Sequence, residues 1–87
     1  MSDLAQQFAQ AQNDVVSLAE RPDNTTLLKL YAFYKQATSG DAGDEKPSMF
    51  DLVAKKKYEA WGKIKGMSKD EAMQQYIAEV ERLLNEE

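Results

Sequence analysis

Two tyrosines and a lysine stand close together near the middle of the sequence. Tyr31, Tyr34 and Lys35 follow one another at intervals of three and one residues, so a helix would carry all three on one side. A phenol can stack on a flat ring or donate a hydrogen bond to a phosphate, and an ammonium group supplies positive charge. The cluster therefore predicts a site for a flat ring joined to an anion. The alternative is that both rings belong to the core and Lys35 is solvated, and spacing alone leaves both open.

A second cluster consists of three consecutive lysines at positions 55–57, followed by Tyr58 and Trp61. Consecutive residues of a helix lie about 100° apart, so at most one or two of these lysines can face a common ligand. Lys57 and Trp61 are four residues apart and share a face. We expect Lys55 and Lys56 to be solvated, and Trp61 and Ile64 to belong to the core.

The chain contains no histidine and no cysteine. This excludes catalytic triads built on either residue, thiolate metal sites and disulfides, and it removes the commonest metal ligand. The neighbouring carboxylates Asp70 and Glu71 fit the positive end of a helix dipole without any catalytic role. We therefore expect a protein that is not an enzyme and that needs no metal and no cofactor.

With 87 residues, of which 43% are hydrophobic and 30% charged, the chain is expected to form one small domain spanning residues 1–87. The net charge is −4, yet residues 29–69 hold nine lysines and only five acids. An acidic protein is a poor binder of nucleic acid in general, whereas a basic centre suggests a local anion site, or a solvated lysine face. No apolar run is long enough for a membrane span, and the first residues do not resemble a secretory signal, so we expect a cytoplasmic protein.

The periodicity predicts four amphipathic helices. A stripe of apolar residues covers positions 4–18, and Arg21-Pro22 stops this helix. The second helix follows Asp23-Asn24 and ends near Gly40, and residues 40–48 form the longest loop. The third runs from about Phe50 or Val53 to Lys65, with Gly66 as its stop. The fourth opens with Ser68 and Glu71, which have the spacing of a capping box. The predicted fold class is an all-α four-helix bundle.

The second helix carries more apolar residues than one buried stripe requires: Leu27, Leu28, Leu30, Tyr31, Phe33 and Tyr34. Such a surplus indicates either an unusually enclosed helix or a groove that accepts a lipid or a partner. The alternative function is therefore a helical protein–protein interaction module that uses this Leu-rich helix.

Several stretches together resemble the acyl-CoA-binding proteins, which are small cytosolic carriers of fatty acyl-CoA esters. The resemblance is carried by residues 31–38, Gly40-Asp41, Lys46-Pro47, residues 54–61 and residues 70–77, and it extends from about Phe8 to Leu84. It implies a bundle with an up-down-down-up arrangement of helices, with the nucleotide head between the second and third helices and in contact with the fourth. It also implies that Phe8, Val15, Leu18, Tyr76, Ile77, Val80 and Leu83 join the first and last helices.

The resemblance also implies roles for individual residues. Tyr31, Lys35 and Lys57 match the positions that hold the 3′-phosphate. Tyr34 matches a residue that stacks on adenine, and Tyr76 matches a tyrosine that closes over the nucleotide. The remaining two residues, Leu27 and Leu28, match positions near the acyl chain.

Three positions depart from the pattern of the family. Val16 stands where many relatives have a polar or basic residue beside the site, which would remove one phosphate contact. Tyr58 stands where a tryptophan is common, and Ser48 replaces a common glycine.

The implied function is non-catalytic binding and intracellular transport or buffering of medium- to long-chain fatty acyl-CoA esters. An acyltransferase or thioesterase is disfavoured because no nucleophile and base are visible. For partners, we expect acyl-CoA as the small-molecule ligand and transient contact with enzymes that use it, in a monomer with no nucleic acid and no stable membrane insertion.

Overall fold

Four α-helices make up the computed structural model, which describes residues 3–43, 47–48 and 50–86. They are α1 (Leu4–Val16), α2 (Asn24–Ser39), α3 (Leu52–Gly62) and α4 (Lys69–Asn85). No strand occurs among these residues, and none of their helices is long and apolar enough to cross a membrane. The prediction of an all-α protein with four helices is confirmed.

Each helix begins at a short polar residue whose side chain binds the first free backbone N–H groups. Asp3, Asp23 and Asp51 cap α1, α2 and α3, and Ser68 caps α4. In all four cases the side-chain oxygen accepts a hydrogen bond from the amide three residues later, at 2.8–3.0 Å. The bond from the Glu71 amide to Ser68 Oγ is half of the predicted capping box.

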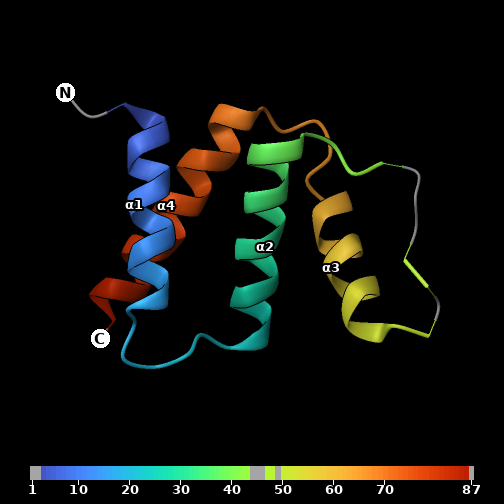
Figure 1. The fold of residues 1–87 in the computed structure, drawn as a ribbon, viewed down its shortest axis with the longest axis horizontal. Helices are drawn as coiled ribbons and strands as arrows, with labels where there is room; N and C mark the ends of the chain where they lie inside the picture. Colours follow the sequence, from blue (N-terminus) through green and yellow to red (C-terminus); the bar gives the residue numbers. More distant parts are fainter. Residues whose placement is uncertain (1–2, 44–46, 49, 87) are drawn as a thin grey trace.

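The helices lie side by side in the order α1, α4, α2, α3 (Figure 1). In this view α1 and α4 run in one direction while α2 and α3 run in the opposite one, which confirms the up-down-down-up arrangement. Helix α4 packs along both α1 and α2, whereas α3 packs along α2 alone. The molecule is therefore a slab of 40 × 28 × 16 Å with α3 at one edge.

The core lies between α1, α4 and α2. Its buried residues are Phe8, Ala11, Leu30, Ala37, Ala72, Tyr76 and Val80, with Val15, Phe33, Met67, Met73, Ile77 and Leu83 packed against them. An alanine on each of the three helices leaves room for their backbones to approach closely, and the large side chains fill the remaining space. No residue of α3 is fully buried, which agrees with its place at the edge of the slab.

Two predicted helix ends differ from the observed ones. Helix α1 stops at Val16, so Leu18 lies beyond it, because the Ser17 hydroxyl and amide bind the carbonyls of Asn13 and Asp14 and end the regular turn. Helix α3 is shorter than expected, since Gly62 weakens it and tight turns replace it over residues 63–66.

Gly66 lies in these turns with a φ of 94°, so it closes the turn and not the helix itself. Of the predicted loop, residues 44–46 are outside the described residues, and so is Lys46 of the family pattern.

A buried amide connects α2 to both of the following segments. The Gln36 side chain has no exposed surface, and its Nε2 donates to Asp41 Oδ1 and to the Met67 carbonyl, each at 2.8 Å. Its Oε1 accepts from Trp61 Nε1 at 3.1 Å. The amide thus uses both donors and its acceptor within the protein, which is the condition for burying a polar group at little cost.

The partners of Gln36 are themselves joined to the loops. Trp61 Nε1 also donates to the Gly40 carbonyl at 2.8 Å, and Asp41 Oδ1 accepts from the Gly66 amide at 2.8 Å. These two bonds to the Asp41 carboxylate, first that from Gly66 and then that from Gln36, lower its pKa. The network holds the end of α2, the end of α3 and the α3–α4 connection in one arrangement.

We predict that Gln36→Ala lowers the free energy of unfolding by about 3 kcal/mol. The substitution removes three hydrogen bonds, each contributing about 1 kcal/mol, from a fully buried position. The control is Gln10→Ala, which removes one exposed bond to Asp14 and should change stability by less than about 0.5 kcal/mol. Urea unfolding followed by circular dichroism measures both variants, and equal stability of the two would contradict a central role for Gln36.

Candidate functional site

A groove of about 640 Å³ opens between α2 and α3 and is bounded at one side by the end of α1 and by α4. Helix α2 supplies half of its lining residues, and the groove reaches the loop between α1 and α2. The lining residues are Val15, Arg21, Asn24, Leu27, Leu28, Leu30, Tyr31, Tyr34, Val53, Lys56, Lys57 and Tyr76.

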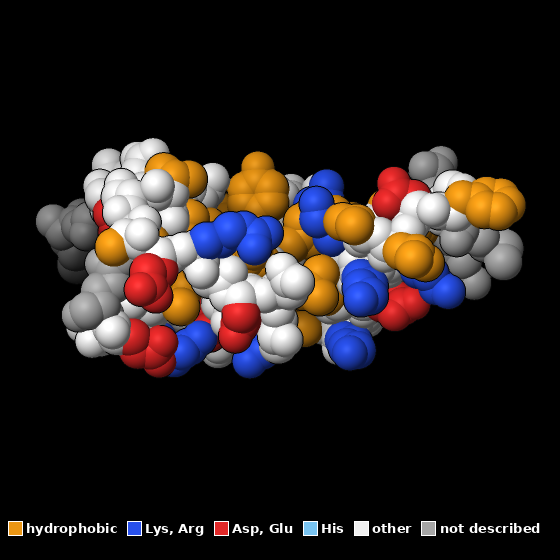
Figure 2. Space-filling view, turned by 90° about the horizontal axis from the view of Figure 1, so that it is seen from below, with side chains coloured by type: hydrophobic (Ala, Val, Ile, Leu, Met, Phe, Trp, Pro, Cys, Tyr) orange, Lys and Arg blue, Asp and Glu red, His pale blue; other side chains and the backbone are white. Residues whose placement is uncertain are grey.

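The lining combines aliphatic, aromatic and cationic side chains. Five residues are aliphatic and three are tyrosines, while the charged members are Arg21, Lys56 and Lys57. No carboxylate is among the residues that line it. Figure 2 looks at the molecule from the side where α2 and α3 begin, and it shows hydrophobic side chains in the middle of this face with Lys and Arg side chains beside them. The groove can therefore hold an anionic group together with an apolar one.

The three tyrosines occupy different environments. The Tyr31 ring lies beneath Lys57, whose Nζ is 5.3 Å from the ring centroid. The Tyr34 side chain is 39% exposed, and its ring is 6.1 Å from that of Phe8 on α1. Tyr76 is only 6% exposed and meets Phe8 edge to face at 5.1 Å. Tyr34 thus offers an accessible ring, while Tyr76 is also a core residue.

Burial, and to a smaller extent the neighbouring Tyr34, raises the pKa of the Tyr76 phenol. A phenol with the ordinary pKa is already protonated at neutral pH, and the upward shift leaves this one protonated as well. Its O–H can therefore act as a hydrogen-bond donor at the edge of the groove.

Six of the seven residues predicted for the site line the groove: Tyr31, Tyr34, Lys57, Tyr76, Leu27 and Leu28. Lys35 does not. Its Nζ lies over the ring of Trp61 at 5.1 Å from the centroid, one helical turn beyond Tyr31. Trp61, expected in the core, is half-buried and supports this lysine from α3.

Two of the cations that line the groove, Lys56 and Arg21, were not expected in the site from the sequence. Lys56 was expected to be solvated, and it is exposed, yet it also lines the groove with Lys57, while Lys55 lies outside. The spacing of Val53, Lys56 and Lys57 is i, i+3 and i+4, and this pattern could have placed them on one face. Arg21 was interpreted only as part of a helix stop, and no periodic pattern marks it.

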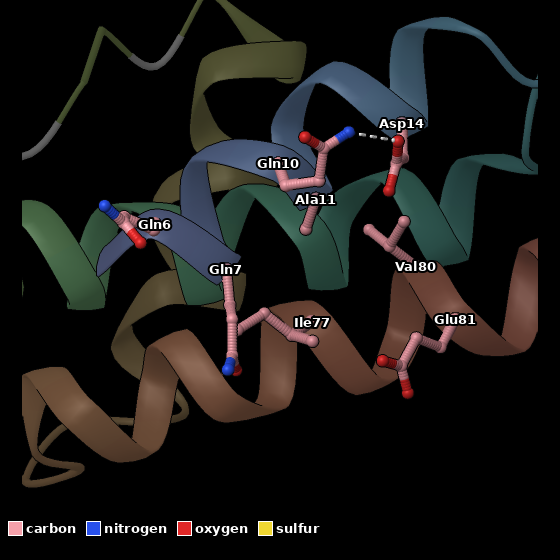
Figure 3. Close-up of a pocket in the computed structure, with 8 residues that line it drawn as sticks. All are labelled: Gln6, Gln7, Gln10, Ala11, Asp14, Ile77, Val80 and Glu81. Atoms are coloured by element: carbon pink, nitrogen blue, oxygen red, sulfur yellow. Dashed lines mark hydrogen bonds between the residues drawn. The ribbon is translucent and has the colours of Figure 1, made fainter. Parts of the chain in front are cut away.

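A separate cleft of about 420 Å³ lies between α1 and α4 (Figure 3). Ala11 and Val80 point into the space between the helices, and glutamines with Asp14 and Glu81 form its rim. Gln10 donates to Asp14 at 2.9 Å. With carboxylates and no lysine or arginine in its lining, this cleft is unsuited to an anion. Within residues 3–43, 47–48 and 50–86, no group of His, Cys, Asp or Glu could hold a metal ion.

The groove and the fold can be compared with known proteins. The sequence model of the family described as "Acyl CoA binding protein" matches residues 5–80. The chain belongs to the acyl-CoA-binding protein family. The family expected from the sequence is thereby confirmed.

Relatives in the family span nearly the whole chain. An acyl-CoA-binding protein homolog of Caenorhabditis elegans is 48% identical over 77 residues, which are 88% of this chain and 90% of the relative. The acyl-CoA-binding protein of Saccharomyces cerevisiae is 43% identical over 81 residues, 93% of each chain. The crystal structure of Oryza sativa acyl-CoA-binding protein 2 superposes with a TM-score of 0.91 at 37% identity, covering 97% of this chain and 93% of that one.

We predict that Tyr76→Ala and Tyr34→Ala differ in their effect on the ligand-free protein. Tyr76→Ala removes a buried ring packed on Phe8 and should cost about 3–5 kcal/mol of stability. Tyr34→Ala alters a partly exposed site and should cost about 1 kcal/mol or less. Urea unfolding of both variants without ligand measures the difference, and a greater loss in Tyr34→Ala would reverse the roles given to the two rings.

Proposed function

We propose that this protein binds fatty acyl-CoA esters without catalysis and transports or buffers medium- to long-chain esters in the cytoplasm. The observation that carries the proposal is the composition of the groove. It joins five aliphatic side chains to three cations and three phenols, with no carboxylate in its lining. An acyl-CoA ester has the matching parts, which are an apolar chain, a flat base and several phosphates.

The nucleotide head would occupy the side of the groove that carries the tyrosines. Tyr31 and Lys57 are adjacent there, and we propose that they hold the 3′-phosphate together with Lys35, which follows Tyr31 by one turn. Charge-assisted hydrogen bonds from phenol and ammonium groups are suited to a phosphate. The exposed ring of Tyr34 can stack on adenine, an interaction worth about 1–3 kcal/mol by analogy with other stacked bases. Tyr76 would close over the nucleotide.

The acyl chain would lie against the aliphatic side chains at the start of α2. Leu27 and Leu28 line the groove there with Leu30 and Val53. Each buried methylene contributes about 0.8 kcal/mol before the costs of binding are subtracted. A long chain thus adds far more affinity than a short one, and the same burial keeps a detergent-like ester away from membranes.

The supporting comparisons concern proteins that are named for binding acyl-CoA, and none of those named here supports the alternative of a protein–protein interaction module. The surplus apolar residues of α2 are accounted for by the groove and the core. We propose that the chain acts as a monomeric acyl-CoA-binding domain that meets acyl-CoA-using enzymes transiently.

We predict that affinity rises steeply with acyl-chain length. Isothermal titration with free CoA, octanoyl-CoA, dodecanoyl-CoA and palmitoyl-CoA should give dissociation constants that fall along the series, because each added methylene is buried against the aliphatic wall. A mixture of inorganic phosphate and free palmitate is the control, because it contains an anion and an acyl chain that are not joined in one molecule. Equal affinity for CoA and palmitoyl-CoA would refute the groove as the site of the acyl chain.

We predict that Lys57→Ala and Lys35→Ala each weaken binding of palmitoyl-CoA by about 1.5–3 kcal/mol, the range for a hydrogen bond to a charged group. Both lysines lie outside the buried core, so the stability of the ligand-free protein should hardly change. The titration is repeated with the 3′-dephospho ester. If the variants lose as much affinity for this ligand as for the complete one, the lysines do not contact the 3′-phosphate.

A further inference from the structure

Arg21 and Lys56 bring two positive charges to the groove from different parts of the fold. Arg21 belongs to the loop between α1 and α2, and Lys56 belongs to α3. Neither forms an ion pair with a carboxylate of the described residues, among which the ion pairs join Arg82 to Glu79 and Glu86. Both side chains are exposed, so they are free to approach an anion in the groove.

The charge of the ligand exceeds what the residues assigned so far supply. A CoA head carries a pyrophosphate in addition to its 3′-phosphate. Of the two lysines placed at the 3′-phosphate, Lys57 lines the groove, while Lys35 rests on the Trp61 ring. Phosphates that leave water need hydrogen-bond donors and positive charge within the site. The pyrophosphate thus requires further cations.

We propose that Arg21 and Lys56 bind the pyrophosphate of the CoA head, an inference that rests on the proposed function. The pyrophosphate joins the nucleotide to the arm that leads to the acyl chain. On α3, Val53 is the aliphatic lining residue, and Lys56 follows it by one helical turn. Lys56 therefore lies next to the aliphatic part of the lining. Arg21 lines the same groove from the loop between α1 and α2, and its planar guanidinium suits two phosphate oxygens at once.

Other cations near the groove do not meet these conditions. Lys55 precedes Lys56 directly but does not line the groove. Arg82 lies in the neighbouring hollow that Arg21 also borders, but its guanidinium is held by Glu79 and Glu86. Arg21 and Lys56 are therefore the two unassigned cations of the described groove that remain available.

The test uses Arg21→Gln and Lys56→Gln, with Lys55→Gln as the matched control. Lys55→Gln removes the same charge from the adjacent position of the same helix, but outside the groove. Each variant is titrated calorimetrically with palmitoyl-CoA and with its 3′-dephospho form, and urea unfolding without ligand verifies that each is folded. Lys57→Ala is included to report on the 3′-phosphate contact.

We expect Arg21→Gln and Lys56→Gln each to weaken palmitoyl-CoA binding about tenfold, as for the loss of one charge-assisted hydrogen bond. The same loss should persist with the 3′-dephospho ester, and Lys55→Gln should change affinity less than twofold. Equal effects of Lys55→Gln and Lys56→Gln would show a general charge effect and overturn the proposal.

Two further outcomes would also overturn the assignment. Losses that vanish with the 3′-dephospho ester would place these residues at the 3′-phosphate instead. Unchanged affinity in Arg21→Gln and Lys56→Gln, with loss in Lys57→Ala, would refute this inference and leave the proposed function standing. A wild-type protein that fails to bind palmitoyl-CoA would refute both.

Discussion

The buried amide of Gln36 is the interaction on which the arrangement of the helices at the groove depends. Helix α3 packs along α2 alone and has no fully buried residue, so hydrophobic contact fixes its position only weakly. Gln36 supplies the missing constraint by binding Trp61 of α3, Asp41 of the preceding loop and Met67 of the following connection. Lys56 and Lys57, which line the groove, lie on α3 as well. Their placement thus depends on the hydrogen bonds that hold Trp61 near the end of this helix.

Two of the clefts formed by the described residues show how spaces between helices can yield different binding surfaces. The cleft between α1 and α4 has small apolar side chains at its base and glutamines and carboxylates at its rim. The groove between α2 and α3 has a similar apolar base, but lysines, an arginine and phenols surround it. The two clefts differ in the sign of the charged side chains that line them, and this sign decides whether an anionic ligand is favoured. A ligand that carries phosphates is attracted to one and repelled by the other.

Much of the fold could be predicted because local signals agree with each other. The 3–4 spacing of apolar residues marked the buried faces of α1, α2 and α4 and the half-buried face of α3, and residues such as Asp23 and Ser68 marked helix starts. The ends of α1 and α3 were missed because Ser17 and Gly62 act locally, against the continuing apolar pattern. The hydrogen bonds of Gln36 and the place of Arg21 in the groove depend on residues that are distant in sequence, so no spacing rule could reveal them.

The packing of α1 has a consequence for how the chain folds as it is synthesised. Among the described residues this helix lies along α4 and along no other helix, and its contacts with α2 are made by side chains such as the rings of Phe8 and Tyr34. During synthesis α1 therefore lacks the helix on which it packs until α4 has left the ribosome. Contacts between distant segments form slowly because the intervening chain must be ordered first. The core is thus completed only once α4 has been made, so a chain interrupted before Tyr76 and Val80 lacks residues that help to bury Phe8.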